Sequence, residues 1–124
     1  MTPKAIWRGA PLFALALGAC SGTGGTTQPV SMAQSVFAAA GGLSAAEMAA
    51  SGYEALPACP GTTPCADPAI VAQIKHYDAQ AYNALQPLVA AAQAGGSVID
   101  AVQFEAAQAA LSAFTGYLAQ HGVK

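Results

Sequence analysis

Three cysteines and two histidines are the residues of this 124-residue chain with the widest range of chemistry. They are Cys20, Cys59, Cys65, His76 and His121. A thiolate can act as a nucleophile, bind a metal ion or enter a disulfide, and an imidazole can transfer protons near neutral pH. The segment around each residue decides among these roles, and the three cysteines stand in two very different segments.

Cys20 ends a segment in which charge and hydropathy are arranged as in an export signal. Its basic side chains, Lys4 and Arg8, come first, and residues 10–19 (APLFALALGA) are almost entirely apolar. A basic start followed by about 7 to 15 apolar residues is typical of a secretory signal peptide. The apolar run is too short for a permanent membrane span, which needs about 20 residues. We therefore expect the segment before Cys20 to direct export.

The tetrapeptide Leu17–Cys20 (LGAC) resembles the lipobox of bacterial lipoproteins, in which small residues precede an obligatory cysteine. The resemblance implies that residues 1–19 are removed as a signal peptide and that the Cys20 thiol carries diacylglycerol. With Ser21 after the cysteine, it also implies a lipid anchor in the outer membrane, facing the periplasm. Two or three acyl chains hold a protein on a membrane almost permanently, because each buried CH₂ contributes roughly 0.8 kcal/mol.

Other interpretations of the leader stay open. Cleavage after Ala14–Ala16 would give a soluble secreted protein, an uncleaved leader would be a short anchor, and the segment would otherwise be a buried helix. Residues 21–31 (SGTGGTTQPVS) have no charge and are rich in Gly and Thr, a composition typical of a flexible coil. We therefore expect residues 20–31 to form a lipidated tether in front of a folded domain at residues 32–124.

Cys59 and Cys65 lie in a stretch (ACPGTTPCAD) whose prolines and glycine fit no regular element. Five residues separate them, and in an exported protein this favours a disulfide within the loop. The alternatives are free thiols, a redox pair or a metal site. Redox pairs usually have two intervening residues, and zinc needs about four suitably spaced ligands, which His76 and His121 do not supply. We expect the disulfide, no metal and no cofactor.

Two short helices are expected before the cysteine loop. The first is at residues 32–40, interrupted by the pair Gly41–Gly42. Ser44 and Glu47 match a capping box, which predicts a second helix at residues 45–55 that ends before Pro57. The first helix has apolar residues at i, i+4 and i+5, namely Met32, Val36 and Phe37. The second is expected to face inward with Leu43, Met48, Tyr53 and Leu56.

Two longer helices are expected after the loop. Asp67 and Pro68 are a strong start signal, and Pro87 is expected to kink the helix that follows. Gly95–Gly96 ends this helix, and Ser97 together with Asp100 starts the last one. Apolar residues in both helices recur three or four positions apart, as on a helix with one buried face. These residues are Ile70, Ile74, Tyr77, Ala81, Leu85, Leu88 and Ala92, then Phe104, Ala107, Leu111, Phe114 and Leu118.

The fold class predicted from these elements is all-α. No segment has the alternating β-branched and aromatic pattern of a strand. The short link between the last two helices makes them antiparallel, so we expect a small helical bundle built on a C-terminal antiparallel helical hairpin, with a flexible N-terminal tether. The abundant alanines favour helix but bury little area, so the core is expected to be slim.

Composition and motifs argue against several functions. Charged residues make up 8% of the chain, against roughly 25% in average proteins, which argues against a nucleic-acid partner. His76 and Asp78 are two residues apart on different helix faces, so both are expected on the solvated side with Lys75 and Asn83. His121 is expected to cap a helix end or to be exposed. No hydrolase, phosphate-binding or zinc-protease motif occurs, and no catalytic residues are expected.

The aromatic side chains are expected to pack in the core, although they would otherwise line a groove for an apolar ligand or a partner helix. Tyr82 lies off the main stripe and is expected to contact the shorter helices or to stay partly exposed. The aromatic residues considered for such a groove are Tyr53, Tyr77, Tyr82, Phe104, Phe114 and Tyr117.

The folded part also resembles small uncharacterised helical proteins of bacteria and their phages. The resemblance rests on the motif Tyr53-x-x-Leu56-Pro57-x-Cys59, on Cys65 and on the segment 78–82, and it implies no activity. The sequence as a whole predicts a non-enzymatic cell-envelope lipoprotein, bound to the membrane by its lipid, with an envelope protein as partner. The alternatives are a subunit similar to the outer-membrane spanins of phage lysis and a carrier of an apolar small ligand.

Overall fold

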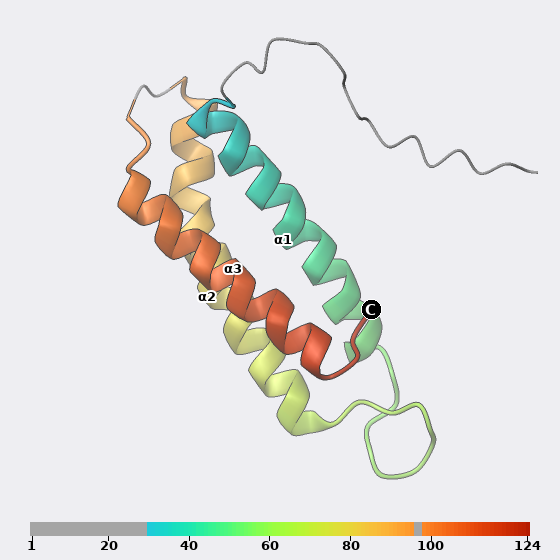
Figure 1. The fold of residues 1–124 in the computed structure, drawn as a ribbon. Coiled ribbons are helices and arrows are strands. Elements are labelled where there is room, and N and C mark those ends of the chain that lie inside the picture. Colours follow the sequence, from blue (N-terminus) through green and yellow to red (C-terminus); the bar gives the residue numbers. More distant parts are fainter. Residues whose placement is uncertain (1–29, 96–97) are drawn as a thin grey trace, which may run out of the picture.

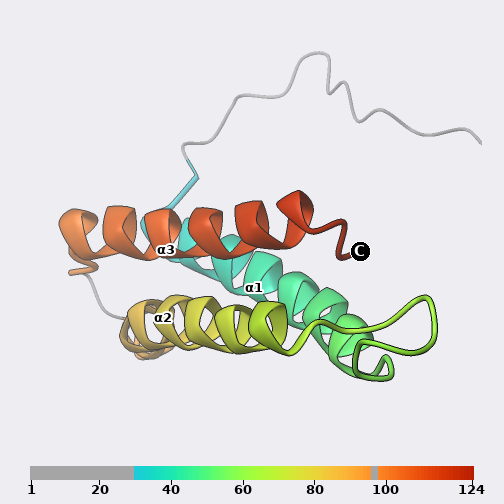
Figure 2. The same cartoon turned by 90° about the horizontal axis from the view of Figure 1, so that it is seen from below.

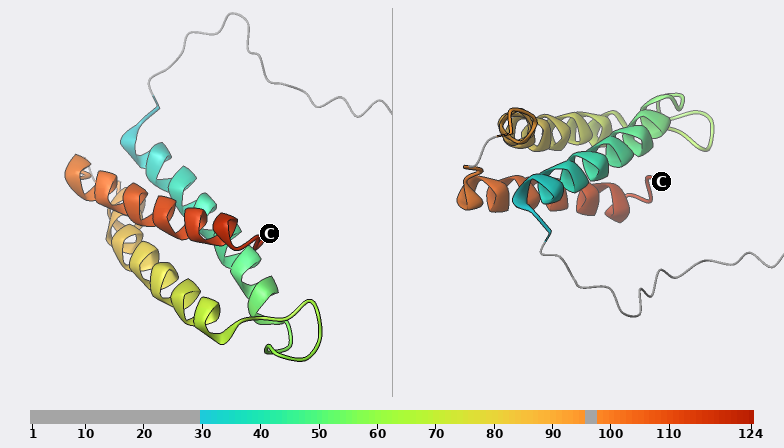
Figure 3. Two further views of the ribbon diagram at one scale, coloured as in Figure 1. Left: turned by 60° about the horizontal axis from the view of Figure 1, so that its bottom comes forward. Right: turned by 90° about the horizontal axis from the view of Figure 1, so that it is seen from above.

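The computed structural model describes residues 30–95 and 98–124, which form three packed helices (Figure 1). The helices are α1 (Met32–Glu54), α2 (Pro68–Gln93) and α3 (Ala101–Gln120). Figure 2 shows α2 and α3 running antiparallel, and Figure 3 shows α1 crossing this pair obliquely. The prediction of an all-α bundle built on a C-terminal helical hairpin is confirmed. The leader, Cys20 and most of the expected tether lie outside the described residues.

The prediction of two short helices before the cysteine loop is wrong, because α1 is one continuous helix over both segments. Gly41 and Gly42 lie inside α1, and neither has a positive φ. The capping box is at Ser31 instead of Ser44: the Gln34 N–H donates to Ser31 Oγ (3.2 Å), and the Ser31 N–H donates to Gln34 Oε1 (2.9 Å). A glycine inside a helix costs only about 1 kcal/mol, which the packing of α1 against its neighbours offsets.

The buried face of α1 also differs from the prediction. Val36 and Leu43 are buried as expected, but Met48 is 71% exposed, and Met32 and Phe37 are exposed as well. Five residues turn a helix by about 140° beyond a full circle, so one continuous helix cannot bury both Leu43 and Met48. The remaining core positions of α1 are filled by Ala46 and Ala50.

The starts of the other two helices rest on aspartate caps. The Asp67 carboxylate accepts the N–H of Ala69 (2.8 Å), and Pro68 is the first residue of α2, as predicted. The Asp100 carboxylate accepts the N–H of Val102 (2.8 Å) and that of Gln103. Asp100 is therefore the cap of α3, which confirms its predicted part in starting this helix; Ser97 lies outside the described residues. α2 continues on both sides of Pro87, and the kink expected there stays a prediction.

The core is divided into two clusters along the bundle. One joins the start of α1 to the end of α2 and the start of α3, and the other lies toward the disulfide loop. Both predicted stripes point inward, with Ile70, Tyr77 and Leu111 only half-buried. Five of the fourteen clustered side chains are alanine, so they bring the helices close together while burying little area each. The first cluster holds Val36, Leu85, Leu88, Ala92, Phe104 and Ala107, and the second holds Leu43, Ala46, Ala50, Ile74, Ala81, Phe114, Leu118 and Val123.

Replacement of Gly41 tests the continuity of α1. A Cβ at Gly41 would meet nothing within 4 Å, so Gly41→Ala is expected to raise the free energy of unfolding by about 0.5–1 kcal/mol in urea titrations. The matched control is Gly95→Ala at the end of α2, where φ is +68°, and this variant is expected to lose about 1 kcal/mol. A destabilised Gly41→Ala protein would mean that the helix breaks at this glycine.

Candidate functional site

Cys59 and Cys65 form a disulfide in the loop between α1 and α2, with their Cα atoms 5.2 Å apart. The loop is also closed by backbone hydrogen bonds. The Cys59 N–H donates to the carbonyl of Ala66 (3.0 Å), and the Ala66 N–H donates to the carbonyl of Pro57 (2.8 Å). Ala66 is buried, so its backbone groups are satisfied by this pairing. The two ends of the loop are thus held side by side.

A tyrosine on α1 connects the loop to the start of α2. The N–H of Asp67, the N-cap residue of α2, donates to the Tyr53 hydroxyl oxygen (3.0 Å). The Asp67 side chain in turn accepts from the N–H of Ala69. The end of α1 and the start of α2 are therefore tied together by the disulfide loop and by this hydrogen bond. The role of the loop is to position the helices.

Removal of the disulfide is expected to weaken the bundle without changing its fold. A closed loop of this length contributes about 2 kcal/mol in the chain-entropy model, and the slim core makes that a large share of the total. The double variant Cys59→Ser–Cys65→Ser should therefore lose about 2 kcal/mol of unfolding free energy, measured in urea.

The control for this variant is the parent protein reduced with dithiothreitol, which should lose a similar amount. Two alkylatable thiols in the unreduced protein, counted by mass spectrometry, would show that the disulfide does not form.

The aromatic side chains mostly pack against the core. Phe104 and Phe114 are buried, and the rings of Tyr77 and Tyr117 lie 5.1 Å apart at the edge of the second cluster. Burial raises the pKa of Tyr117, and the neighbouring Tyr77 adds to the effect. The His121 ring lies against that of Tyr117, with centroids 4.4 Å apart and planes tilted by 45°, and His121 is the C-cap residue of α3, as the sequence predicted.

His76 and Asp78 do not converge. His76 is exposed, and its Nε2 lies 3.1 Å from the amide nitrogen of Gln80. The prediction that Asp78 lies on the solvated side of the helix is wrong, because this residue is half-buried. Its Oδ1 atom is buried without a hydrogen-bond partner. The signal was present in the sequence: Asp78 follows Ile74 by four residues, which places it at the edge of the buried stripe.

Asp78 belongs to an acidic groove between α1 and α2 that also contains Glu47 and Glu54. Burial raises the pKa of Glu47, and the negative charge of Asp78 raises it further. Lys75 lies at the rim, with its Nζ 3.8 Å from Glu54 Oε2. Among residues 30–95 and 98–124, no three His, Cys, Asp or Glu side chains are grouped so that they could hold a metal ion. The groove therefore contains three carboxylates, of which Glu47 and Asp78 repel each other and Glu54 is paired with the lysine at the edge.

The repulsion between these carboxylates predicts a pH dependence of stability. The pKa of Glu47 is higher in the folded chain than in the unfolded one, so the folded state binds more protons and loses stability as the pH rises through the interval above 4.5. Asp78→Asn removes one charge and should raise the unfolding free energy by about 0.5 kcal/mol near neutral pH, and by less in acid.

The experiment is a series of urea titrations across the pH range, with NMR detection of the Glu47 carboxyl. The matched control is Glu105→Gln at an exposed position of α3. An Asp78→Asn variant in which the pKa of Glu47 does not fall would show that the two carboxylates do not interact.

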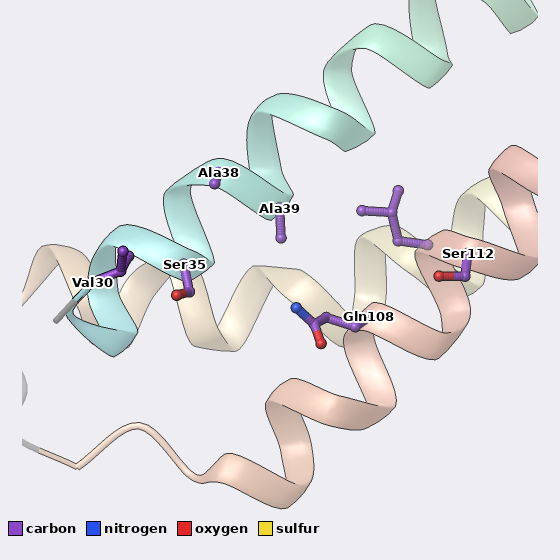
Figure 4. Close-up of a pocket in the computed structure, with 7 residues that line it drawn as sticks. Val30, Ser35, Ala38, Ala39, Gln108 and Ser112 are labelled. Carbon is purple, nitrogen blue, oxygen red and sulfur yellow. The ribbon is translucent and has the colours of Figure 1, made fainter. Parts of the chain in front are cut away.

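Another groove lies between α1 and α3 and has a volume of about 530 Å³. Figure 4 shows Ser35 and Ala39 of α1 on one side of it and Gln108 and Ser112 of α3 on the other. Its remaining lining residues are Val30, Ala38 and Leu111, so no charged side chain takes part. Such walls suit a neutral, largely apolar surface, and they offer no acid or base.

A smaller groove of about 240 Å³ lies between α1 and α2. Tyr82 lines it together with Leu43 and Ser44 of α1, and its side chain is 49% exposed. The expectation that Tyr82 stays partly exposed is confirmed. Tyr82 marks the border between the helix face that packs in the core and the face that meets solvent.

No protein-family model, no curated protein and no solved structure matches this chain. Within the part of the chain that the structure describes, no helix is long and apolar enough to cross a membrane. The features of the described residues that bear on function are a disulfide-closed loop, an uncharged groove between α1 and α3, and an acidic groove between α1 and α2.

Proposed function

We propose that the protein is a non-enzymatic lipoprotein of the cell envelope, in which a small helical bundle is carried on a lipid tether. The observation that carries the proposal is the use of the cysteines. Cys59 and Cys65 are joined in a disulfide, a bond that persists in oxidising compartments outside the cytoplasm. The remaining cysteine of the chain, Cys20, follows a basic and then apolar leader, where lipoproteins carry their acylated residue.

The proposed location is the outer membrane, with the bundle facing the periplasm. Export through the leader and acylation of Cys20 would hold the bundle at the membrane surface. Ser21 after the acylated cysteine supports the outer of two membranes, by the resemblance to bacterial lipoproteins.

The proposed action is binding or structural support, with an envelope protein as partner. The groove between α1 and α3 supports this part of the proposal, because its walls are small neutral side chains that a helix or loop of another protein could approach closely. The polar atoms of Gln108 and Ser112 at its rim could complete hydrogen bonds to such a partner.

Replacement of Cys20 tests the proposal in bacterial cells. Cys20→Ala removes the sulfur to which the lipid would be attached, so this variant should lose all incorporation of labelled palmitate and leave the membrane fraction. The control is Cys59→Ser–Cys65→Ser, which keeps Cys20 and should be labelled like the parent. A second variant, Ser21→Asp, should still be labelled but should move to the inner membrane.

Two results would end the proposal. One is continued labelling of Cys20→Ala. The other is the recovery of the chain from the cytosol with Met1 in place and the Cys20 thiol unmodified, established by mass spectrometry of the intact protein.

A further inference from the structure

One end of the bundle displays apolar side chains that have no place in the core. We call it the entry end, because the described chain enters the bundle there; it comprises residues 30–32 and 98–102. Val98 is 84% exposed, Val102 74%, Val30 70% and Met32 39%. By contrast Ile99, in the same segment, packs against the core.

These side chains come from segments far apart in the sequence that meet at the same place. The first core cluster joins Val36 near the start of α1, Ala92 near the end of α2 and Phe104 near the start of α3. Figure 1 shows the same arrangement, with these three helix termini at one end and the disulfide loop at the other. The four exposed side chains of the entry end therefore belong to segments that meet at one end of a three-helix bundle.

The positive charges of the described lysines lie far from the entry end. Both lysines, Lys75 and Lys124, belong to the disulfide-loop half, since Lys75 pairs with Glu54 at the end of α1 and Lys124 follows α3. Near the entry end the described carboxylates are Asp100 and Glu105. The Asp100 carboxylate accepts two backbone N–H groups, so its charge is held at the N-terminus of α3, where it is favourable.

We infer that the entry end docks on the lipid bilayer that carries the anchor, with the valines and Met32 entering the boundary between headgroups and acyl chains. The inference rests on the proposed function, since it needs the lipid on Cys20. Nine residues separate Cys20 from Val30, so ten Cα–Cα steps keep the entry end within about 36 Å of the anchoring cysteine, and the opposite end of the bundle is the one held away.

Because the segment between Cys20 and Val30 is short, weak apolar contacts are sufficient to hold the entry end on the membrane. Four exposed aliphatic side chains would bind a membrane poorly from free solution, but a tethered group meets the surface at a high effective concentration. Because the entry end has no lysine or arginine among its described residues, the docking is apolar and does not depend on anionic lipid.

The test uses tryptophan as a probe of depth. The chain's one tryptophan, Trp7, lies in the leader, so the processed chain from Cys20 to Lys124 has none. Val98→Trp places a probe at the entry end, and Thr62→Trp places a matched probe at an exposed position of the disulfide loop.

Each protein is attached through its Cys20 thiol to phosphatidylcholine vesicles that contain a maleimide headgroup lipid and acyl chains brominated as quenchers. The disulfide keeps Cys59 and Cys65 from reacting, and flotation of the vesicles verifies the attachment. The emission of the Val98→Trp protein should shift to shorter wavelength and be quenched by the brominated chains, whereas that of the Thr62→Trp protein should do neither. Added salt should leave the result unchanged.

A second pair of substitutions shows whether the natural side chains cause the docking. Val30→Ser and Val102→Ser, added to the Val98→Trp protein, should lower the ratio of docked to undocked bundle by roughly 10-fold or more. Circular dichroism should be unchanged, because both valines are exposed in the fold.

Two outcomes would overturn the inference. The first is equal quenching of the entry-end probe and the loop probe on verified vesicles. The second is an emission of the Val98→Trp protein that shifts without vesicles as the protein concentration rises, which would mean that a second copy covers the entry end. Because the anchor is supplied chemically, absence of lipidation in cells would contradict the proposed function without changing the result of this test.

Discussion

Close approach of three helices through small side chains is the constraint on which this fold depends. Where Ala46, Ala81 and Ala107 face inward, the helices lie close together and no bulky side chain can be added without separating them. The larger residues, such as Phe114 and Leu88, fill the space that remains. Little area is buried at each alanine, so the bundle depends more than most on what fixes its ends. These ends are fixed by local bonds, because the caps satisfy backbone N–H groups at each helix start and the disulfide loop ties α1 to α2.

The difference between local bonds at the helix ends and packing between helices also explains which features could be predicted from the sequence. The all-α class, the start of α2 and both long apolar stripes follow from local signals, and each agrees with the structure. The continuity of α1 does not, because Gly41 and Gly42 favour a break locally and only packing against the other helices outweighs them. The exposure of Met48 follows from that error, since the register of a longer helix decides which residues face inward.

The candidate site was harder to predict for a related reason. Asp78 and Glu47 lie on different helices, and nothing local shows that the crossing of α1 over α2 brings their charges together. The entry end was hard to predict for the same reason, because nothing in the sequence near Val30 or Val102 shows that the fold brings them to one end of the bundle. Tertiary arrangement, and not residue type, creates both features.

The docking that we propose at the entry end would also set the orientation of everything else. The 26 residues of α2 span about 39 Å, so a bundle standing on that end would carry its disulfide loop about this far from the lipid surface. The groove between α1 and α3 extends from Val30 to Ser112, so its Val30 end would lie nearer the membrane. A partner that lay in this groove would therefore be aligned along the membrane normal. In this proposal the tether would give the bundle its location, and the apolar end would give it a direction.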